Sequence, residues 1–505
     1  MTHRASDAPP HTDEHSSVGV VIASVAVLLL LASLDQTIVS TALPTIVADL
    51  GGLEHLSWVV TAYILASTVV APLYGKLGDL YGRRVMVFVS VSVFLIGSML
   101  CGAATSMEFL IFARALQGLG GGGLFVLALS IIADVIPPKD RGKIQGVFAG
   151  VFGISSVVGP LIGGWFVEVA SWHWIFYVNL PFGLAALVGF FFAFKAQTKT
   201  VAHKIDYLGA GLLTLALGGL VLVTSLGGRT LGWDDPRLLV VVGIAAIAFA
   251  AFFFAETRAS EPVLPLSLFR GNVFSVTSAI GFVSGAIMFG SLTFIPVYLQ
   301  IAKGASPTES GWQLIPMTIG ILTASTLSGR YMGRTGRYKI LPMIGLSVAS
   351  GGLFLLTQLS SDTPAPMLWA ALVLVGGGLG TVFPVVTTAV QNTVPREQLG
   401  TATAAGLMFR QVGGSIAVAL FGAIFAARMA TEVGGQIEGV ADVAELGPQR
   451  LANLPETTRE LISVAVSAAL HPIYWIAFAL AVVGVALTFL LREVPLTSRM
   501  VPRGE

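Results

Sequence analysis

The feature that most limits what this chain can fold into is a series of uncharged, apolar stretches of about 20 residues along almost its whole length. Wound as a helix, a stretch of this length crosses a hydrocarbon core roughly 30 Å thick. Only 11% of the 505 residues are charged and 55% are hydrophobic, whereas a soluble domain carries about 25% charged residues. The sequence therefore predicts an all-α polytopic membrane protein.

Fourteen segments have the composition of membrane helices. They cover residues 18–42, 56–74, 85–104, 109–133, 146–167, 174–194, 207–226, 238–255, 273–299, 312–328, 340–356, 367–390, 402–427 and 471–491. Residues 1–17 lack the basic region and the cleavage site of a signal peptide. We therefore expect a disordered cytoplasmic tail there, and a second cytoplasmic tail at residues 493–505.

Lysine and arginine indicate on which side of the membrane each loop lies. With the N-terminus inside, twenty of these residues fall in cytoplasmic loops and tails and six in outer loops. Positively charged loops stay on the cytoplasmic side, and an even number of helices returns the chain to the side where it began. We predict a multi-pass protein of the inner (cytoplasmic) membrane with both termini in the cytoplasm.

The chain also repeats itself. The glycines and arginines of residues 75–83, after the second segment, recur in register at residues 329–337, after the tenth. A second echo pairs residues 136–142, after the fourth segment, with residues 394–400, after the twelfth. Such repeats indicate two related six-helix bundles, the architecture of transporters that rock two halves around a central site.

The repeat divides the chain into three parts. The first bundle is expected at residues 18–195 and the second at residues 271–492, which includes an outer loop at residues 429–470. Residues 196–270 form a linker that carries two inserted helices. Within the outer loop, residues 457–466 have the apolar spacing of an amphipathic helix. We expect this helix either to lie on the membrane surface or to form a lid over the outer mouth.

Composition excludes several other kinds of chemistry. The net charge of +1 gives no sign of a nucleic-acid partner, and the only cysteine, Cys101, forms no disulfide within the chain. The seven histidines are scattered without the spacing of metal ligands. A glycine-rich run at residues 118–123 fits a dinucleotide fingerprint only formally, because no strand precedes it. We expect no metal, no cofactor and no enzymatic activity, and a monomer surrounded by membrane lipid.

Asp35 is the residue with the strongest functional signal. An ionisable group inside a membrane helix is costly and marks a functional path by default, and no other carboxylate lies centrally in a segment. Arg114 is expected at a similar depth. Burial favours the neutral form of the carboxyl group and a nearby guanidinium favours its charged form, so a change in their separation couples proton binding to conformation. The alternative is a permanent structural ion pair.

The segment after the second helix resembles the signature loop of the major facilitator superfamily. Its matching residues are Gly75, Lys76, Gly78, Asp79, Gly82, Arg83 and Arg84. The resemblance implies that the glycines permit a tight turn and that the charges lock helices at the cytoplasmic face. The positive-inside rule alone explains the arginines but not the glycine spacing. Gly333 stands where the second copy would have the acid, so the charge pair is expected only in the first half.

Further motifs resemble the fourteen-helix drug:proton antiporter family of that superfamily. They are residues 34–44 around Asp35, residues 58–63 and residues 172–183, with His173 where the family usually has arginine. Residues 114–118 resemble the second motif of the superfamily as a whole. The antiporter motif of the fifth helix is matched by Gly153, Gly159, Pro160, Gly163 and Gly164. The resemblance implies export against protons; ordinary packing of small residues in lipid is the alternative for the fifth helix.

Several residues are candidates for the substrate cavity. They are Gln36, Tyr63, Gln117, Met288, Phe289, Tyr298, Arg410 and Gln411. Methionine and aromatic side chains in an apolar helix more often pack than line a pocket. Arg410 and Gln411 are polar at membrane depth, where they face either the cavity or a helix interface.

These patterns together predict an alternating-access antiporter that exchanges protons for lipophilic small molecules. Because only one central carboxylate is present, neutral and monocationic compounds are expected to be favoured over dications. Fold does not fix substrate. The alternatives are a dedicated exporter of an endogenous lipid, siderophore or metabolite, and a nutrient facilitator or symporter.

Overall fold

The computed structural model describes residues 13–51, 56–193, 206–227, 231–433 and 455–496. Within these ranges the chain is helical, and the pairing of Gly227 with Leu231 is an isolated bridge. The helices of the first half are α1 (Asp13–Leu50), α2 (Leu56–Tyr81), α3 (Arg83–Gly102), α4 (Met107–Val135), α5 (Pro138–Val169), α6 (Trp174–Tyr177) and α7 (Asn179–Ala193).

The remaining helices follow the linker. They are α8 (Tyr207–Leu226), α9 (Pro236–Glu256), α10 (Asn272–Val297), α11 (Pro307–Gln313), α12 (Ile315–Thr335), α13 (Ile340–Leu356), α14 (Ala365–Thr393), α15 (Leu399–Val433) and α17 (Glu456–Leu490). Each of the fourteen predicted segments overlaps a helix. Among the described residues, eleven helices are long and apolar enough to span a membrane, and α13 is apolar but shorter.

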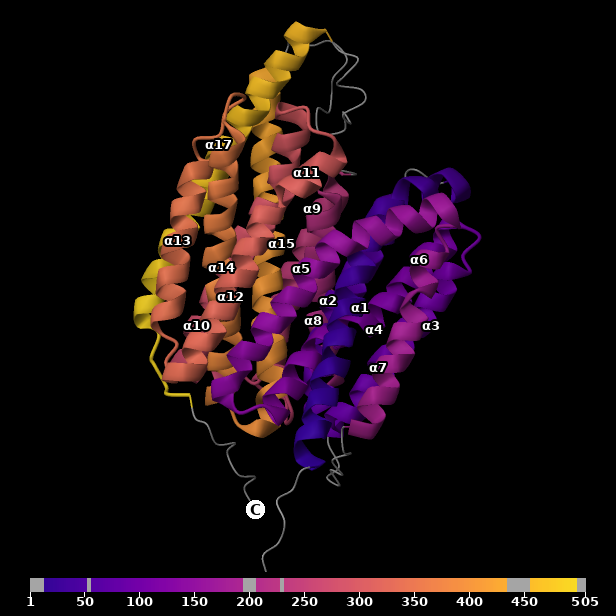
Figure 1. Ribbon diagram of the computed structural model, residues 1–505, viewed down its shortest axis with the longest axis vertical. Coiled ribbons are helices and arrows are strands. Elements are labelled where there is room, and N and C mark those ends of the chain that lie inside the picture. Colours follow the sequence, from indigo (N-terminus) through magenta and orange to yellow (C-terminus); the bar gives the residue numbers. More distant parts are fainter. Residues whose placement is uncertain (1–12, 52–55, 194–205, 228–230, 434–454, 497–505) are drawn as a thin grey trace, which may run out of the picture.

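The helices form two bundles that lie side by side (Figure 1). One bundle contains α1 to α7, and the other contains α10, α12 to α15 and α17. The helix α8 of the predicted insertion packs against both α2 and α15, and α9 packs on α8. The first described helix begins and the last one ends at the same end of the molecule (Figure 1). We call it the inner end, after the sequence-based prediction that both termini lie on the cytoplasmic side.

Two local expectations were wrong. Most of the predicted signature loop is helical: Gly75 to Asp79 belong to the last turns of α2, and only Gly82 separates α2 from α3. Gly82 has a φ of 92°, a conformation that favours glycine. The segment 457–466 is not a separate surface helix, because it continues into the last span as α17, where Ile462 and Val466 are fully buried. Of the expected outer loop, residues 434–454 lie outside the described residues.

The repeated glycines bring the two bundles together at the inner end. Gly75 of α2 packs against Gly400 of α15, where a Cβ atom at Gly75 would lie 2.7 Å from the Gly400 carbonyl oxygen. The second copy repeats this contact, since Gly329 of α12 packs against the backbone of Gly142 of α5. The first glycine of each signature copy therefore packs against the glycine of the second echo in the opposite bundle. Small residues permit this backbone approach between membrane helices.

This packing predicts a large difference between two glycine-to-alanine substitutions in α15. A Cβ atom at Gly400 would overlap the Gly75 carbonyl oxygen and the Arg83 guanidinium, whereas nothing lies within 4 Å of a Cβ atom at Gly422. We expect Gly400→Ala to destabilise the protein by about 1–3 kcal/mol. Gly422→Ala should be neutral or stabilising by roughly 0.5–1 kcal/mol, because alanine is the better helix former. Thermal unfolding in detergent, followed by intrinsic fluorescence, measures both; equal unfolding temperatures would contradict the contact.

Candidate functional site

The first site centres on Asp35, halfway along α1, and its carboxylate receives three side-chain donors. Arg114 of α4 donates from Nη1 to Oδ2 at 2.6 Å. Gln117, one turn further along α4, donates from Nε2 to Oδ1 at 2.8 Å, and Asn179 at the start of α7 donates to the same oxygen at 3.2 Å. The Asp35 side chain has no exposed surface. The two charges expected at similar depth are therefore in direct contact.

A second layer holds these groups in place. Arg114 also donates from Nε to the Val59 carbonyl oxygen at 3.2 Å and from Nη1 to Gln117 Oε1 at 2.6 Å. Its guanidinium lies 4.3 Å from the centre of the Tyr63 ring. Ser98 of α3 accepts hydrogen bonds from Gln117 and Asn179. The network thus ties α1, α2, α3, α4 and α7 to one buried carboxylate.

Glycines let these helices come close enough for the network to form. Gly97 of α3 lies against the backbone of Gln117, and a Cβ atom there would lie 2.5 Å from the Gln117 nitrogen. Gly118 of α4 packs equally tightly against the backbone of Tyr63. The glycine-rich run at residues 118–123 therefore serves helix packing, as its sequence context indicated.

The network is an arrangement of charges and hydrogen bonds around one carboxylate. Protonation of Asp35 would remove its attraction to Arg114 and leave the arginine with the neutral acceptors Gln117 and Val59. A proton and the Asp35–Arg114 contact therefore compete for the same oxygen atoms. Within the described residues no cluster of three metal-ligating side chains is found.

Two members of the network were missed from the sequence. Asn179 stands in the motif at residues 172–183, but its role could not be assigned without the fold. Ser98 is one of several serines in α3, and nothing in the local pattern distinguishes it. The available signal is polarity alone, because a buried amide or hydroxyl group in an apolar helix requires a hydrogen-bond partner.

Helix α5 connects this site to the other bundle. Thr37, two residues after Asp35, donates to the Ser155 carbonyl oxygen at 3.1 Å, and a Cβ atom at Gly159 would overlap the Thr37 hydroxyl. The same helix packs against α12. Of the other predicted motif residues, Gly163 is buried and Gly164 has open space around its Cβ position. The side-chain surroundings of Gly153 and Pro160 lie outside the described residues.

The predicted cavity residues do not form one group. Tyr63 and Gln117 belong to the Asp35 network, and Gln36 is exposed beside it. Tyr298 is fully buried and donates to the Ser360 carbonyl oxygen at 2.8 Å, which places it in the packing of the second bundle.

Two further candidates also take part in packing. Phe289 packs against Gly414, and Met288 packs against the core of the second bundle. Packing, the more common role of such side chains, therefore accounts for the aromatic and methionine candidates of α10 and its extension.

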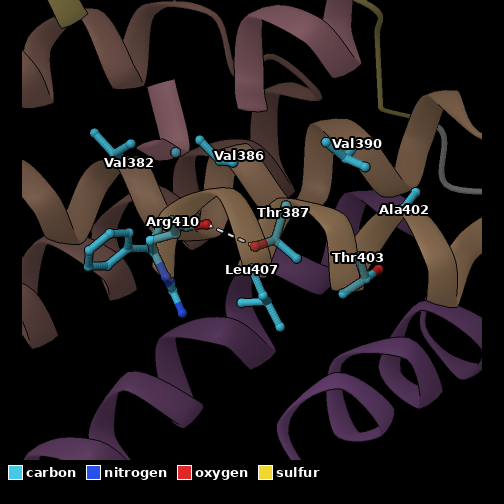
Figure 2. Close-up of a pocket in the computed structure, with 11 residues that line it drawn as sticks. Val382, Val386, Thr387, Val390, Ala402, Thr403, Leu407 and Arg410 are labelled. Atoms are coloured by element: carbon cyan, nitrogen blue, oxygen red, sulfur yellow. Dashed lines mark hydrogen bonds between the residues drawn. The ribbon is translucent and has the colours of Figure 1, made fainter. Parts of the chain in front are cut away.

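Arg410 of α15 lies in a separate pocket between α10, α14 and α15 (Figure 2). Val382, Val386 and Leu407 give the pocket apolar walls. The Arg410 guanidinium lies 5.0 Å from the centre of the Phe383 ring. Gln411, the neighbouring candidate, is half-buried and does not line this pocket.

The inner end carries an ion-pair cluster that crosses between the bundles. Asp79 of α2 accepts hydrogen bonds from the backbone N–H groups of Gly400 at 3.0 Å and Thr401 at 2.7 Å, the first residues of α15. A carboxylate at a helix N-terminus is favoured by the helix dipole. Arg83 pairs with Asp79 and, at 3.2 Å, with Asp134 of α4. The sequence did not anticipate Asp134.

Other polar contacts cross at the same end. Arg141 of α5 donates to the Gln391 carbonyl oxygen at 3.2 Å, and Gln145 donates to Thr388 at 3.4 Å. Lys76 pairs with Glu261 in the linker at 3.5 Å. Arg84 donates instead to the carbonyl oxygen of Phe191 within its own bundle. In the described part of the chain, the hydrogen bonds that join the two bundles all lie at the inner end.

Comparison with known proteins agrees with this architecture. A transporter of the MFS type from Mycobacterium tuberculosis, described as uncharacterised, is 42% identical over 93% of this chain and 69% of its own length. The multidrug transporter protein MdtP of Bacillus subtilis is 34% identical over 95% of this chain and 94% of its own.

A solved structure and a family model complete the comparison. The proton:xylose symporter XylE has the same fold, with a TM-score of 0.62 at 14% identity over 95% of this chain and 97% of its own. The family model of the Major Facilitator Superfamily matches residues 25–418. The chain is a multi-pass membrane protein that belongs to the major facilitator superfamily, whose members are transporters rather than enzymes.

Proposed function

We propose that this protein is a proton-coupled antiporter that exports lipophilic small molecules across the inner membrane by alternating access. The observation that supports the proposal most is the buried contact of Asp35 with Arg114. Asp35 is the only carboxylate near the middle of a predicted span, and an ionisable residue at membrane depth is functional by default. The names of relatives such as the multidrug transporter of Bacillus subtilis favour export of foreign compounds.

The proposed cycle uses α5 as the link between proton and substrate. A proton on Asp35 weakens its hold on Arg114 and changes the position of α1. Thr37 and Gly159 transmit this change to α5, which packs against α12 of the other bundle. The contacts of Asp79 with the start of α15 close the inner end, and they must break for a compound to enter from the cytoplasm or inner leaflet. Both termini and all signature residues face the cytoplasm in this proposal.

A dedicated exporter of an endogenous lipid, siderophore or metabolite uses the same geometry with another substrate. The proposed proton step is common to both, so it is tested first and separately from substrate identity. A nutrient symporter is disfavoured by the antiporter motif of the fifth helix.

We expect Asp35→Asn to abolish transport driven by a proton gradient while the protein still inserts into the membrane. Asparagine keeps the shape of the side chain and its hydrogen bonds with Gln117 and Asn179. Unlike a carboxyl group, it cannot bind or release a proton near neutral pH. The measurement is dye efflux from energised vesicles, with empty vesicles as the baseline. The matched control is Glu108→Gln, which neutralises an exposed carboxylate near the outer start of α4. Wild-type efflux by the Asp35 variant would remove Asp35 from the proton path.

Among cationic compounds we expect monocations to be exported better than dications. The preference follows because one carboxylate neutralises one positive charge of a ligand. In this structure both Asp35 oxygens already accept hydrogen bonds from the protein. A second positive charge would remain unpaired in a low-dielectric cavity, at a cost of several kcal/mol. Ethidium and propidium share one aromatic body and differ by one quaternary ammonium group. Equal export of the two dyes by the same vesicles would contradict the argument.

A further inference from the structure

The second bundle contains a membrane-embedded arginine whose environment differs from that of Arg114. Arg410 lies eleven residues after the start of α15, about 16 Å along the helix at 1.5 Å per residue. This is close to half the thickness of a hydrocarbon core of roughly 30 Å. Arg114 has a carboxylate, an amide and a carbonyl oxygen as partners. Among the described residues, Arg410 has neither an ion pair nor a side-chain hydrogen bond, and its one recorded partner is the Phe383 ring.

The pocket around Arg410 combines apolar walls with this single charge. Of the polar side chains that line it, Thr387 donates to the Phe383 carbonyl oxygen, and Thr403 donates to Leu399 and accepts from Gln391. Their hydroxyl donors are therefore used within the protein. The guanidinium group of Arg410 points away from the valines toward the helices of the first bundle (Figure 2). Its N–H groups are the donors that the pocket offers to a ligand.

The backbone of α15 is fixed at this position. A Cβ atom at Gly285 of α10 would overlap the Arg410 carbonyl oxygen and would lie 3.0 Å from the Arg410 Cγ atom. The stem of the side chain is thus held while its head remains available. A guanidinium that is desolvated without an anion is unfavourable at membrane depth. A carboxylate supplies both the missing charge and the flat pair of acceptors that matches the guanidinium.

From these contacts we infer that the pocket at Arg410 binds the carboxylate of an amphiphilic organic anion, whose apolar body lies against Val382, Val386 and Leu407. This inference rests on the proposed function, because it names a substrate class for the same transporter. It differs from the charge ranking among cations, which concerns the single carboxylate of the first bundle. Cations are repelled at Arg410, and neutral lipophilic compounds bind there through the apolar walls alone.

The test is a binding measurement that needs no proton gradient. The full-length protein in phosphatidylcholine nanodiscs is titrated with 1-pyrenebutyrate and with 1-pyrenebutanol, which share the same apolar body. Quenching of tryptophan fluorescence, corrected with empty nanodiscs, gives the two dissociation constants. We expect the carboxylate to bind about tenfold or more tightly than the alcohol, as charge-assisted hydrogen bonds allow. Equal affinity of the two probes for the wild-type protein would overturn the inference.

Three variants separate binding from stability. Arg410→Gln should abolish the difference between the probes, and Arg410→Lys should keep a reduced difference, because it retains the charge but not the fork of donors. Arg428→Gln, which removes an exposed charge near the other end of the same helix, should keep the full difference. A purely structural role through Phe383 would change unfolding temperature without changing the preference for the carboxylate. A full preference in Arg410→Gln, or its loss in Arg410→Lys, would contradict the proposal.

An anionic lipid head group is the other possible source of the same chemistry. If replacing part of the phosphatidylcholine with phosphatidylglycerol abolishes the preference, the site belongs to a lipid and the inference fails. If the preference is unchanged, the free amphiphile is supported. The result is independent of the Asp35→Asn efflux assay. A protein that binds the carboxylate but does not respond to a proton gradient would disprove the proposed function and leave this inference intact.

Discussion

The burial of Asp35 against Arg114 is the interaction on which the first bundle depends. Placing either charge alone at the centre of the membrane costs about 2.5–3.5 kcal/mol on insertion scales. The pair avoids that cost because Gln117 and Asn179 donate to Asp35 and because Gln117 and Val59 accept from Arg114. Ser98 in turn accepts from the two amide side chains. Five helices must therefore meet at one point, and glycines on their contact faces make this meeting possible. The close helix packing at the glycines is therefore needed for the buried ion pair to have its hydrogen-bond partners.

The inner end uses charge for a different purpose. Asp79 is held by Arg83 in its own bundle and by the backbone at the start of α15 in the other. Its hydrogen bonds with the second bundle can therefore be broken without separating the ion pair. The second copy has no acid, and Gly333 lies near the Lys143 side chain. The two copies thus share the glycine contact but not the electrostatic one, which makes closure of the inner end asymmetric.

The two membrane arginines show the same asymmetry. Arg114 is neutralised within the protein, and this restricts it to roles that involve Asp35. Arg410 lies beside an aromatic ring, which stabilises a cation less than a carboxylate does. In the proposed function and the further inference, Asp35 of one bundle binds the proton and Arg410 of the other binds an anionic ligand. Helix α5, which contacts both α1 and α12, connects the two.

The sequence alone determined the membrane setting, the helical class, the repeat and the superfamily, because segment length, hydropathy and glycine spacing are local properties. It also identified Asp35, since one carboxylate in an apolar helix stands out without any fold. It did not determine which polar groups surround Asp35. Asn179 and Ser98 look ordinary in sequence, and they lie more than 60 residues away from it.

Only the tertiary structure shows which residues pack against one another and which polar groups have hydrogen-bond partners. The segment 457–466 has an amphipathic pattern that suits a membrane surface as well as a bundle, and only the packing of Ile462 and Val466 assigns it to α17. Tyr298 and Arg410 were equal candidates for the cavity by composition. The Tyr298 hydroxyl donates its hydrogen bond to the Ser360 carbonyl oxygen, whereas Arg410 has no anionic partner among the described residues. Hydrogen-bond partners come from distant parts of the chain, so three-dimensional contact decides which polar groups remain available for a ligand.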